Sequence, residues 1–318
     1  MSITQYDLLR AAAYGRSRFK PVSPTDYERI THIVRSGRAQ DYFRIGDQIM
    51  TTYTDTNGNT YDCPFDVVAF KTATTLESGI TVPSMVLQMH YATHEEIQFD
   101  APESNRPAEQ DYQGQIAQYG WNRYLMSAIR QWLNSDKAAG EWWTAQHEYD
   151  AAPTQASTVN GFMRGLPADF LAMLKPVKVE TCRNYRDPDT AQTSGTYEYD
   201  TTYDTFYLPS TEDEYTVANE PNHREGTAWQ YWIDRLTLPA QEINESLPQQ
   251  NYVSAEVTHG IKAHRHFILS SRSSAAVVWL RSAARGTSTS EWYVSTAGSV
   301  SYYGAHYSRR SAPACEIC

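Results

Sequence analysis

The chain has 318 residues, of which 41% are apolar and 20% are charged, which is typical of a globular protein with a buried core. Its formal net charge of −10 argues against nucleic acid and anionic membranes as partners. The N-terminus lacks the basic region and apolar run of a secretory signal, and no apolar run of about 18 residues predicts a membrane span. The four cysteines form no disulfide framework, which indicates synthesis in a reducing compartment.

Residues 4–37 are predicted to be helical. Leu8, Leu9, Ala12 and Ala13 suit one face of a first helix, and the stretch from Ser23 to Glu28 resembles the cap of a second helix that runs through Val34. We therefore interpret residues 1–42 as an N-terminal helical segment. Such helices either dock on a neighbouring subunit or larger assembly, or pack on their own domain.

Residues 43–70 are predicted to form a β-hairpin, because Asn57-Gly58 is a strong turn signal between two strand-like runs. The same loop loosely resembles a calcium loop, but it lacks a glutamate at the twelve-residue spacing, so the plain turn is favoured. A further strand is expected over Met85–His90.

The middle of the chain mixes helices and strands. A polar loop is expected over residues 101–120, and another polar insertion over residues 184–200. Apolar spacing predicts helices over Trp121–Asn134, Gly165–Leu174 and Thr227–Leu236, and strands over Val177–Cys182 and Thr205–Leu208. Without an internal repeat, an interdomain linker or strict alternation of strands and helices, residues 43–318 are predicted to form one α+β domain with short strands, helices and long loops.

Three stretches in chain order resemble a known family. They are Ser127-Ala-Ile-Arg130-Gln-Trp132-Leu133-Asn134, then Thr205-Phe-Tyr-Leu208-Pro-Ser210, then Trp279-Leu280-Arg281-Ser282 followed by Arg285-Gly286, Trp292, Gly298-x-Val300 and Arg310-x-Ala-Pro313-Ala-Cys315. This order is similar to the C-type lectin fold of the formylglycine-generating-enzyme type found in phages and gut bacteria. The C-terminus resembles the variable proteins of diversity-generating retroelements, although Ser311 stands where that family usually has Cys.

The resemblance covers residues 43–318 and implies a function. Some of these variable proteins are phage tail receptor-binding proteins and determine host tropism. Their retroelements mutate adenines, which scatters Asn codons into residues such as Tyr, Ser, His and Thr but never into Trp or Glu. In this chain the resemblance implies a variable region at residues 284–311 and a set of fixed scaffold residues: Trp279, Arg281, Arg285, Trp292, Gly298, Arg310 and Pro313.

The pattern of the variable region itself is that of a strand followed by a turn. Period-two alternation predicts that Trp292 and Val294 face the core and that Thr287, Thr289, Tyr293 and Ser295 face outward. Glu291 shares the outward parity but is not counted as diversified. Thr296-Ala-Gly298 permits a turn, and Val300 is expected to return to the core.

The outward residues are predicted to bind a ligand. Residues 284–311 contain 4 Tyr and 7 Ser, a mixture in which Tyr supplies rigid contact area and Ser supplies adaptable hydrogen bonds. The alternative is a Tyr- and Ser-rich β surface without a partner, although four exposed Tyr so close together form a patch that lone proteins usually avoid. The predicted ligand-binding residues are Thr287, Thr289, Tyr293, Ser295, Ser299, Ser301, Tyr302, Tyr303, His306, Tyr307 and Ser308.

We therefore expect a binding protein rather than an enzyme, with no cofactor, whose partner is a protein or glycan receptor on a target cell surface. The resemblance suggests a location on the virion, at the phage tail, and a homo-oligomer such as a trimer. If the protein is bacterial, the lack of a signal predicts cytoplasmic synthesis without secretion. The alternatives are a bacterial surface or accessory binding protein of the same fold and an enzyme of the oxidase branch.

The sequence offers little for other chemistry. Cys315-Glu-Ile-Cys318 is one C-x-x-C pair without a second pair, so we expect no metal, and the oxidase branch would need reactive cysteines in a pocket. The acidic residues Asp200, Asp204, Glu212, Asp213 and Glu214 are expected to form a solvated loop. Arg281, Arg285 and Arg310 are expected to hold loop carbonyls or carboxylates.

Overall fold

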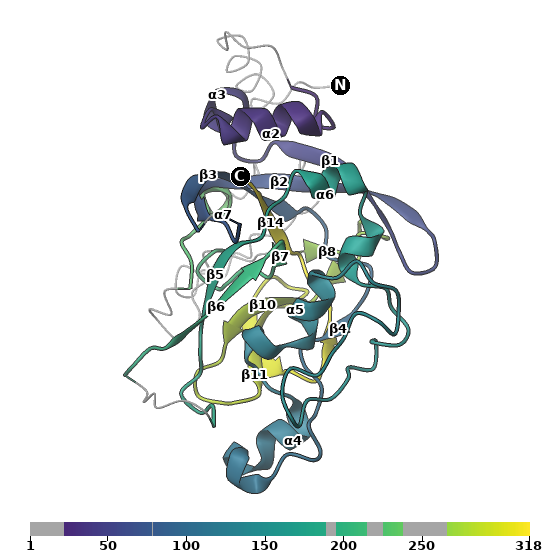
Figure 1. The fold of residues 1–318 in the computed structure, drawn as a ribbon, viewed down its shortest axis with the longest axis vertical. Helices are drawn as coiled ribbons and strands as arrows, with labels where there is room; N and C mark the ends of the chain where they lie inside the picture. The colour runs from purple at the N-terminus through teal and green to yellow at the C-terminus, as the bar shows by residue number, and fades with distance from the viewer. Residues whose placement is uncertain (1–21, 78, 189–194, 215–224, 238–265) are drawn as a thin grey trace.

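The chain folds into several small antiparallel sheets joined by short helices and long loops, as a computed structural model shows (Figure 1). The structure describes residues 22–77, 79–188, 195–214, 225–237 and 266–318. This confirms the predicted α+β class. Among these residues, no helix is long and apolar enough to cross a membrane.

The largest sheet has five strands in the order β1-β2-β3-β14-β7. Their bounds are β1 Gln48–Thr54, β2 Thr60–Thr74, β3 Thr81–Met89, β14 Ala314–Ile317 and β7 Phe206–Tyr207. β1 and β2 form the predicted hairpin, in which Gly58 has a φ of 85° that a residue with a side chain rarely adopts. The Asp55 carboxylate accepts hydrogen bonds from the backbone N–H groups of Asn57 and Asn59 at 2.9 and 2.8 Å, so it stabilises the turn.

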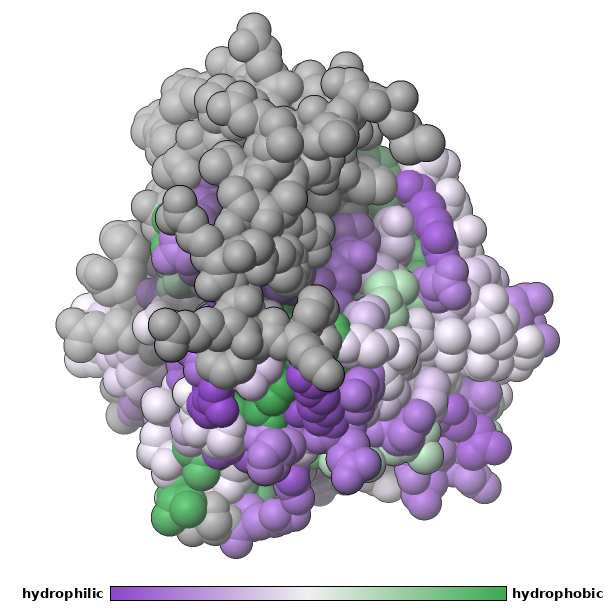
Figure 2. Space-filling view, turned by 90° about the horizontal axis from the view of Figure 1, so that it is seen from above, coloured by the Kyte–Doolittle hydropathy of each residue, from purple (hydrophilic) through white to green (hydrophobic). Residues whose placement is uncertain are grey.

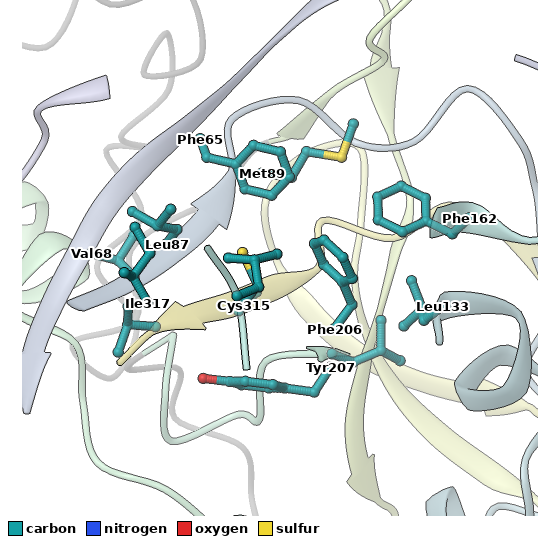
Figure 3. Packing of buried hydrophobic residues seen from close by; sticks show 14 of the residues in the cluster. Phe65, Val68, Leu87, Met89, Leu133, Phe162, Phe206, Tyr207, Cys315 and Ile317 are labelled. Atoms are coloured by element: carbon teal, nitrogen blue, oxygen red, sulfur yellow. The ribbon is translucent and has the colours of Figure 1, made fainter. Parts of the chain in front are cut away.

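The C-terminal strand lies inside this sheet. Cys315 of β14 stands opposite Leu87 of β3 on one side and Phe206 of β7 on the other. Figure 3 shows Cys315 packed among Phe65, Leu87, Phe206 and Ile317, all of which are buried. Because β14 completes the main core, residues 284–311 precede a firmly held strand.

Helix α2, Tyr27–Arg35, packs on the main sheet at the top of Figure 1. Asp26 caps it by accepting a hydrogen bond from Arg29 N, and Ile30, Ile33 and Val34 are buried in the main core. The Arg35 guanidinium donates to the Cys318 carbonyl at 2.7 Å. The described residues 22–42 therefore share the core of the later domain, whereas Leu8 to Ala13 lie outside the described residues.

Seen from the α2 end, the described surface is mostly hydrophilic (Figure 2). Hydrophobic residues show only as small, separate areas among the described atoms of this view. α3, Ala39–Tyr42, adjoins α2 at this end.

A second sheet contains β10 Val278–Ala283, β11 Ser290–Val294 and β12 Val300–Gly304 in that order. It separates two groups of apolar side chains. Trp292 and Val294 pack on one side with Val278 and Leu280, whereas Trp279 belongs to the main core on the other side. The prediction that Trp292 and Val294 face a core is confirmed, and Val300 packs against the same smaller cluster.

The remaining strands form two-stranded sheets: β4 Ile97–Gln98 with β13 Ser308–Arg309, β5 Val177–Cys182 with β6 Tyr199–Asp204, and β8 His266–Phe267 with β9 Ala275–Ala276. The helices between them are α4 Gln115–Tyr119, α5 Ala128–Leu133, α6 Ala168–Ala172 and α7 Gln230–Thr237. The helix predicted over Trp121–Asn134 is shorter, because Ser127 caps α5 and the preceding residues Tyr124–Met126 form a 3-10 turn. The loop predicted over residues 101–120 contains α4, and β6 lies partly within the predicted polar insertion.

The acidic stretch is not a solvated loop, and that prediction is wrong. Asp200, Asp204 and Asp213 are buried, and each one faces an arginine. The nitrogen–oxygen distances are 2.7 Å to Arg123, 2.8 Å to Arg130 and 2.5 Å to Arg281, respectively. These ion pairs hold the irregular loops, because planar guanidinium groups satisfy several acceptors at once.

Candidate ligand-binding face

On one side of the second sheet, the exposure of the aromatic side chains increases from β10 to β12. Trp279 of β10 stands opposite Tyr293 of β11, and their ring centroids lie 6.1 Å apart at 85°. Tyr293 stands opposite Ser301 of β12, and Tyr303 follows two residues later on the same side. Trp279 is fully buried, Tyr293 is half-buried and Tyr303 is 45% exposed. This side therefore carries aromatic side chains from the core out to the surface.

Tyr302 lies on the opposite side of the sheet. It stands across from Trp292, and the two ring centroids are 5.1 Å apart at 79°. Tyr302 is 51% exposed although Trp292 is buried. The adjacent tyrosines 302 and 303 consequently do not belong to one continuous face.

The segment after β12 lies on the same side as Tyr293 and Tyr303, and hydrogen bonds from other parts of the chain hold its backbone. The Gln98 amide donates to the His306 carbonyl at 2.7 Å, and the Gln155 amide donates to the Ser308 hydroxyl at 2.7 Å. The His306 N–H donates to the Tyr119 carbonyl at 2.9 Å. These bonds tie the segment to three other parts of the chain, so its side chains are presented on a fixed backbone.

We call the resulting surface the tyrosine face, defined by Tyr119, Tyr293, Tyr303, His306, Tyr307 and Arg309. Its rings touch in sequence: 5.4 Å between the centroids of Tyr119 and His306, 4.2 Å between His306 and Tyr307, and 4.5 Å between Tyr307 and Tyr303. Tyr119, Tyr303 and Tyr307 are exposed. Contiguous exposed aromatic rings are typical of binding surfaces.

Arg309 lies among these rings. Its guanidinium carbon is 5.4 Å from the Tyr293 ring centroid, 5.8 Å from that of Tyr303, 5.6 Å from that of Tyr307 and 5.9 Å from that of buried Trp279. These distances permit cation–π attraction. The tyrosine face thus combines wide apolar contact with one cation.

Two ionisable groups of the face have shifted pKa values. A hydrogen bond with Tyr303 raises the pKa of Tyr307, with a smaller opposing effect from Arg309. Burial lowers the pKa of His306, although the Tyr119 carbonyl partly opposes that change. The lowered pKa of His306 disfavours its charged form, so Arg309 supplies the positive charge of this face.

The sequence-predicted residues do not share one environment. Ser299, Tyr302, Tyr303 and Tyr307 are exposed, whereas the following are half-buried: Thr287, Tyr293, Ser295, Ser301, His306 and Ser308. Thr289 is only 4% exposed, so the prediction that it faces outward is wrong. It precedes β11, where the chain has not yet adopted the alternation of a strand. Glu291, which shares its parity, is fully buried as well.

Several predicted variable residues have local partners. The Thr287 hydroxyl accepts from Ser290 N at 3.0 Å, and the Asn122 amide donates to the Thr287 carbonyl at 2.9 Å. The hydroxyls of Ser295 and Ser299 lie 2.7 Å apart across the turn in which Gly298 has a φ of 82°. These contacts shape the turns at both ends of β11.

The predicted scaffold residues contact the loops behind the sheet. Arg281 is buried and donates to the Leu208 carbonyl at 2.8 Å and to the Glu225 carbonyl, besides its pair with Asp213. Arg285 donates to the Thr196 carbonyl and lies 4.0 Å from the Tyr197 ring centroid. Arg310 donates to the Thr93 and His94 carbonyls and pairs with Glu96 at 3.2 Å.

The last scaffold residue, Pro313, is buried, and its carbonyl accepts from Met89 N at 2.9 Å. This bond joins the chain just before β14 to the end of β3. It therefore fixes the C-terminal end of the segment that carries most residues of the tyrosine face.

Two residues of the tyrosine face are not among the ligand-binding residues predicted from the sequence. Arg309 follows Ser308 directly, and the two-residue spacing from Tyr307 was the available signal. Tyr119 comes from α4, almost two hundred residues earlier in the chain, and no local pattern links it to residues 284–311.

The cysteines are poor nucleophiles. All four are free and buried, and burial raises the pKa of Cys63 and Cys315 well above the usual thiol range. Burial also raises the pKa of Cys318 to about 11. Within the described ranges, no group of three or more His, Cys, Asp or Glu side chains is arranged to hold a metal ion.

Residues 91–317 match a family described as a domain of unknown function, DUF6273. The match covers well over half of the chain. This protein belongs to the DUF6273 family. Neither the curated proteins nor the solved structures gave a match. The DUF6273 region begins just after β3, and it contains the whole second sheet and all residues of the tyrosine face.

Proposed function

We propose that this DUF6273 protein is a ligand-binding protein that recognises a receptor on a target cell through its tyrosine face. The observation that carries the proposal is the contiguous ring series Tyr119, His306, Tyr307 and Tyr303, whose tyrosines are exposed and whose last two members lie beside Arg309. Tyr and Arg are enriched among the residues that dominate binding energy, and they lie here on a backbone held by partly buried hydrogen bonds.

The finer proposal is a C-type-lectin-like fold of the formylglycine-generating-enzyme type, with residues 284–311 diversified by a retroelement and the protein attached to a phage tail. Its support is the order of the sequence stretches that resemble that family, together with the exposure of tyrosines 302, 303 and 307 beside buried Trp292. Loose packing requirements at exposed positions permit variation without unfolding. A homo-oligomer, such as a trimer, would add avidity to weak single contacts.

An oxidase role receives less support. A reactive thiol needs exposure and a lowered pKa, whereas all four cysteines are buried and burial raises the pKa of Cys63, Cys315 and Cys318. We therefore keep the binding protein as the proposed function.

The first test is sequencing of this gene across a natural population. The expected result is variation concentrated at Ser299, Ser301 and tyrosines 302, 303 and 307, with Trp292 and Gly298 constant. Uniformly low variation would contradict diversification and leave a receptor of fixed specificity.

The second test measures binding of the labelled full-length protein to bacteria isolated from the same sample as the gene. Tyr303→Ala combined with Tyr307→Ala should abolish binding, whereas Arg164→Ala, an exposed change outside the face, should not. Equal binding by both variants would refute the tyrosine face as the receptor site.

A further inference from the structure

Arg309 differs from the arginines that hold the fold. Arg123, Arg130 and Arg281 each pair with a buried carboxylate within 2.8 Å. No described residue pairs with the Arg309 guanidinium or accepts a hydrogen bond from it. Its Nε is buried without an acceptor, as the Nε of Arg281 is too, so the difference lies in the terminal nitrogens. Its surroundings are aromatic rings. This side chain consequently has donors that the described part of the fold leaves unused.

An unused guanidinium in such surroundings favours an oxyanion. Its N–H groups form a planar fork that matches the two oxygens of a carboxylate. The neighbouring rings keep water away from part of the group, which strengthens a charge-assisted hydrogen bond. The Nε is buried, so a carboxylate would pair with the two terminal nitrogens of Arg309, which are not buried and have no acceptor among the described residues.

The rest of the face limits the kind of ligand. The net charge of −10 repels a dense polyanion, so an isolated carboxylate on an otherwise uncharged body suits the face better. The exposed rings of Tyr303 and Tyr307 offer apolar area beside phenol hydroxyls, and Ser301 lies opposite Tyr293 with a further hydroxyl. A pyranose ring has both apolar C–H faces and hydroxyls, which match this mixture.

We propose that Arg309, Tyr303 and Tyr307 form a subsite for an acidic sugar, a hexuronic acid whose carboxylate binds Arg309 and whose ring lies on the tyrosines. This inference rests on the proposed function and names the ligand class of the same face. It requires no covalent step and no metal.

The direct test uses nuclear magnetic resonance titration of the full chain with methyl glucuronide and, as the neutral counterpart, methyl glucoside. The expected result is that the glucuronide binds about tenfold more tightly or better, because the two ligands differ by one charge-assisted hydrogen-bonded group. Arg309→Gln should remove this preference, and Arg309→Lys, which keeps the charge but not the fork, should retain only part of it. Arg164→Ala should bind as the wild type does.

Thermal melting of each variant shows whether it folds. Equal affinity for the two sugars in the wild type, or an unchanged preference in a folded Arg309→Gln protein, would overturn the inference. Binding of a glutamate-containing peptide, but not of the glucuronide, with the same dependence on Arg309 would also overturn it and would identify a peptide ligand.

The bacterial binding assay separates this inference from the proposed function. If Arg309→Gln binds the cells normally while Tyr303→Ala with Tyr307→Ala does not, the acidic-sugar subsite is refuted and the binding face remains. If none of these variants alters cell binding, both proposals fail.

Discussion

Arg281 and Asp213 form a buried ion pair, with 2.5 Å between Nη1 and Oδ2. Burial alone would lower the pKa of Arg281, but the carboxylates of Asp213 and Glu225 raise it, so the guanidinium stays charged. The pair joins β10 to the loop after β7. In that loop the Asp213 carbonyl also accepts a hydrogen bond from the backbone N–H of Trp229. Arg281 therefore links the second sheet to the main core.

The first prediction concerns this pair. Arg281→Ala should lower the free energy of unfolding by about 3–5 kcal/mol, because it leaves the buried Asp213 carboxylate without its partner. Urea unfolding followed by fluorescence measures the change, with Arg164→Ala as the matched control at an exposed site. A folded Arg281→Ala protein with wild-type stability and no ligand binding would show instead that Arg281 acts on the ligand.

The sequence was informative where local chemistry decides structure. The Asn57-Gly58 turn, the strand over Val177–Cys182 and the inward positions of Trp292 and Val294 follow from neighbouring residues alone. Local patterns could not show that acidic residues near 200–214 pair with arginines, because each pair joins distant parts of the chain.

The tyrosine face was only partly predictable, because some of its contacts also join distant parts of the chain. Alternation and the Tyr and Ser content located the region, but they did not show that Thr289 lies before β11 and is buried. Tyr119 joins the face only through the fold, by its contact with His306. The ion pairs, the start of β11 and the place of Tyr119 therefore had to come from the structure.

The second prediction contrasts neighbouring residues of the second sheet. Trp292→Ala should cost about 3–5 kcal/mol of stability, because it leaves a cavity beside Val294. Tyr303→Ala should change stability by no more than about 0.5 kcal/mol, because that side chain is exposed. Melting temperatures of the two variants give the comparison, and a larger loss for Tyr303→Ala would mean that Tyr303 supports the fold.

The third prediction tests tolerance of variation. Ser299→Tyr places a ring on the exposed turn and should leave the melting temperature nearly unchanged. Thr289→Tyr forces the same ring into a buried position and should cost about 1–3 kcal/mol. If thermal melting shows both variants to be equally stable, position 289 tolerates a large side chain in spite of its burial, which would contradict this prediction.

The fourth prediction concerns Glu291 and pH. Burial raises the pKa of this carboxyl well above its ordinary value of 4.5, and Glu225 and Asp187 raise it further. Both Glu291 oxygens are buried without a hydrogen-bond partner. In the unfolded chain the group ionises near its ordinary pKa, whereas in the folded protein it keeps its proton to higher pH. The folded state consequently holds the extra proton, and Glu291 lowers stability progressively as the pH rises above 4.5.

Glu291→Gln removes this ionisation while keeping the shape of the protonated acid. The variant should match the wild type at pH 4, where the wild-type carboxyl is mostly protonated in both the folded and the unfolded state. It should be more stable than the wild type at pH 8. Melting temperatures of both proteins from pH 4 to pH 8 provide the measurement, and the difference between them cancels the other titrating groups. A difference that stays constant over this range would mean that Glu291 has the same pKa in the folded and unfolded states. A difference that favours the wild type at pH 8 would mean that the folded protein stabilises the carboxylate, for instance through a cation bound at Glu291.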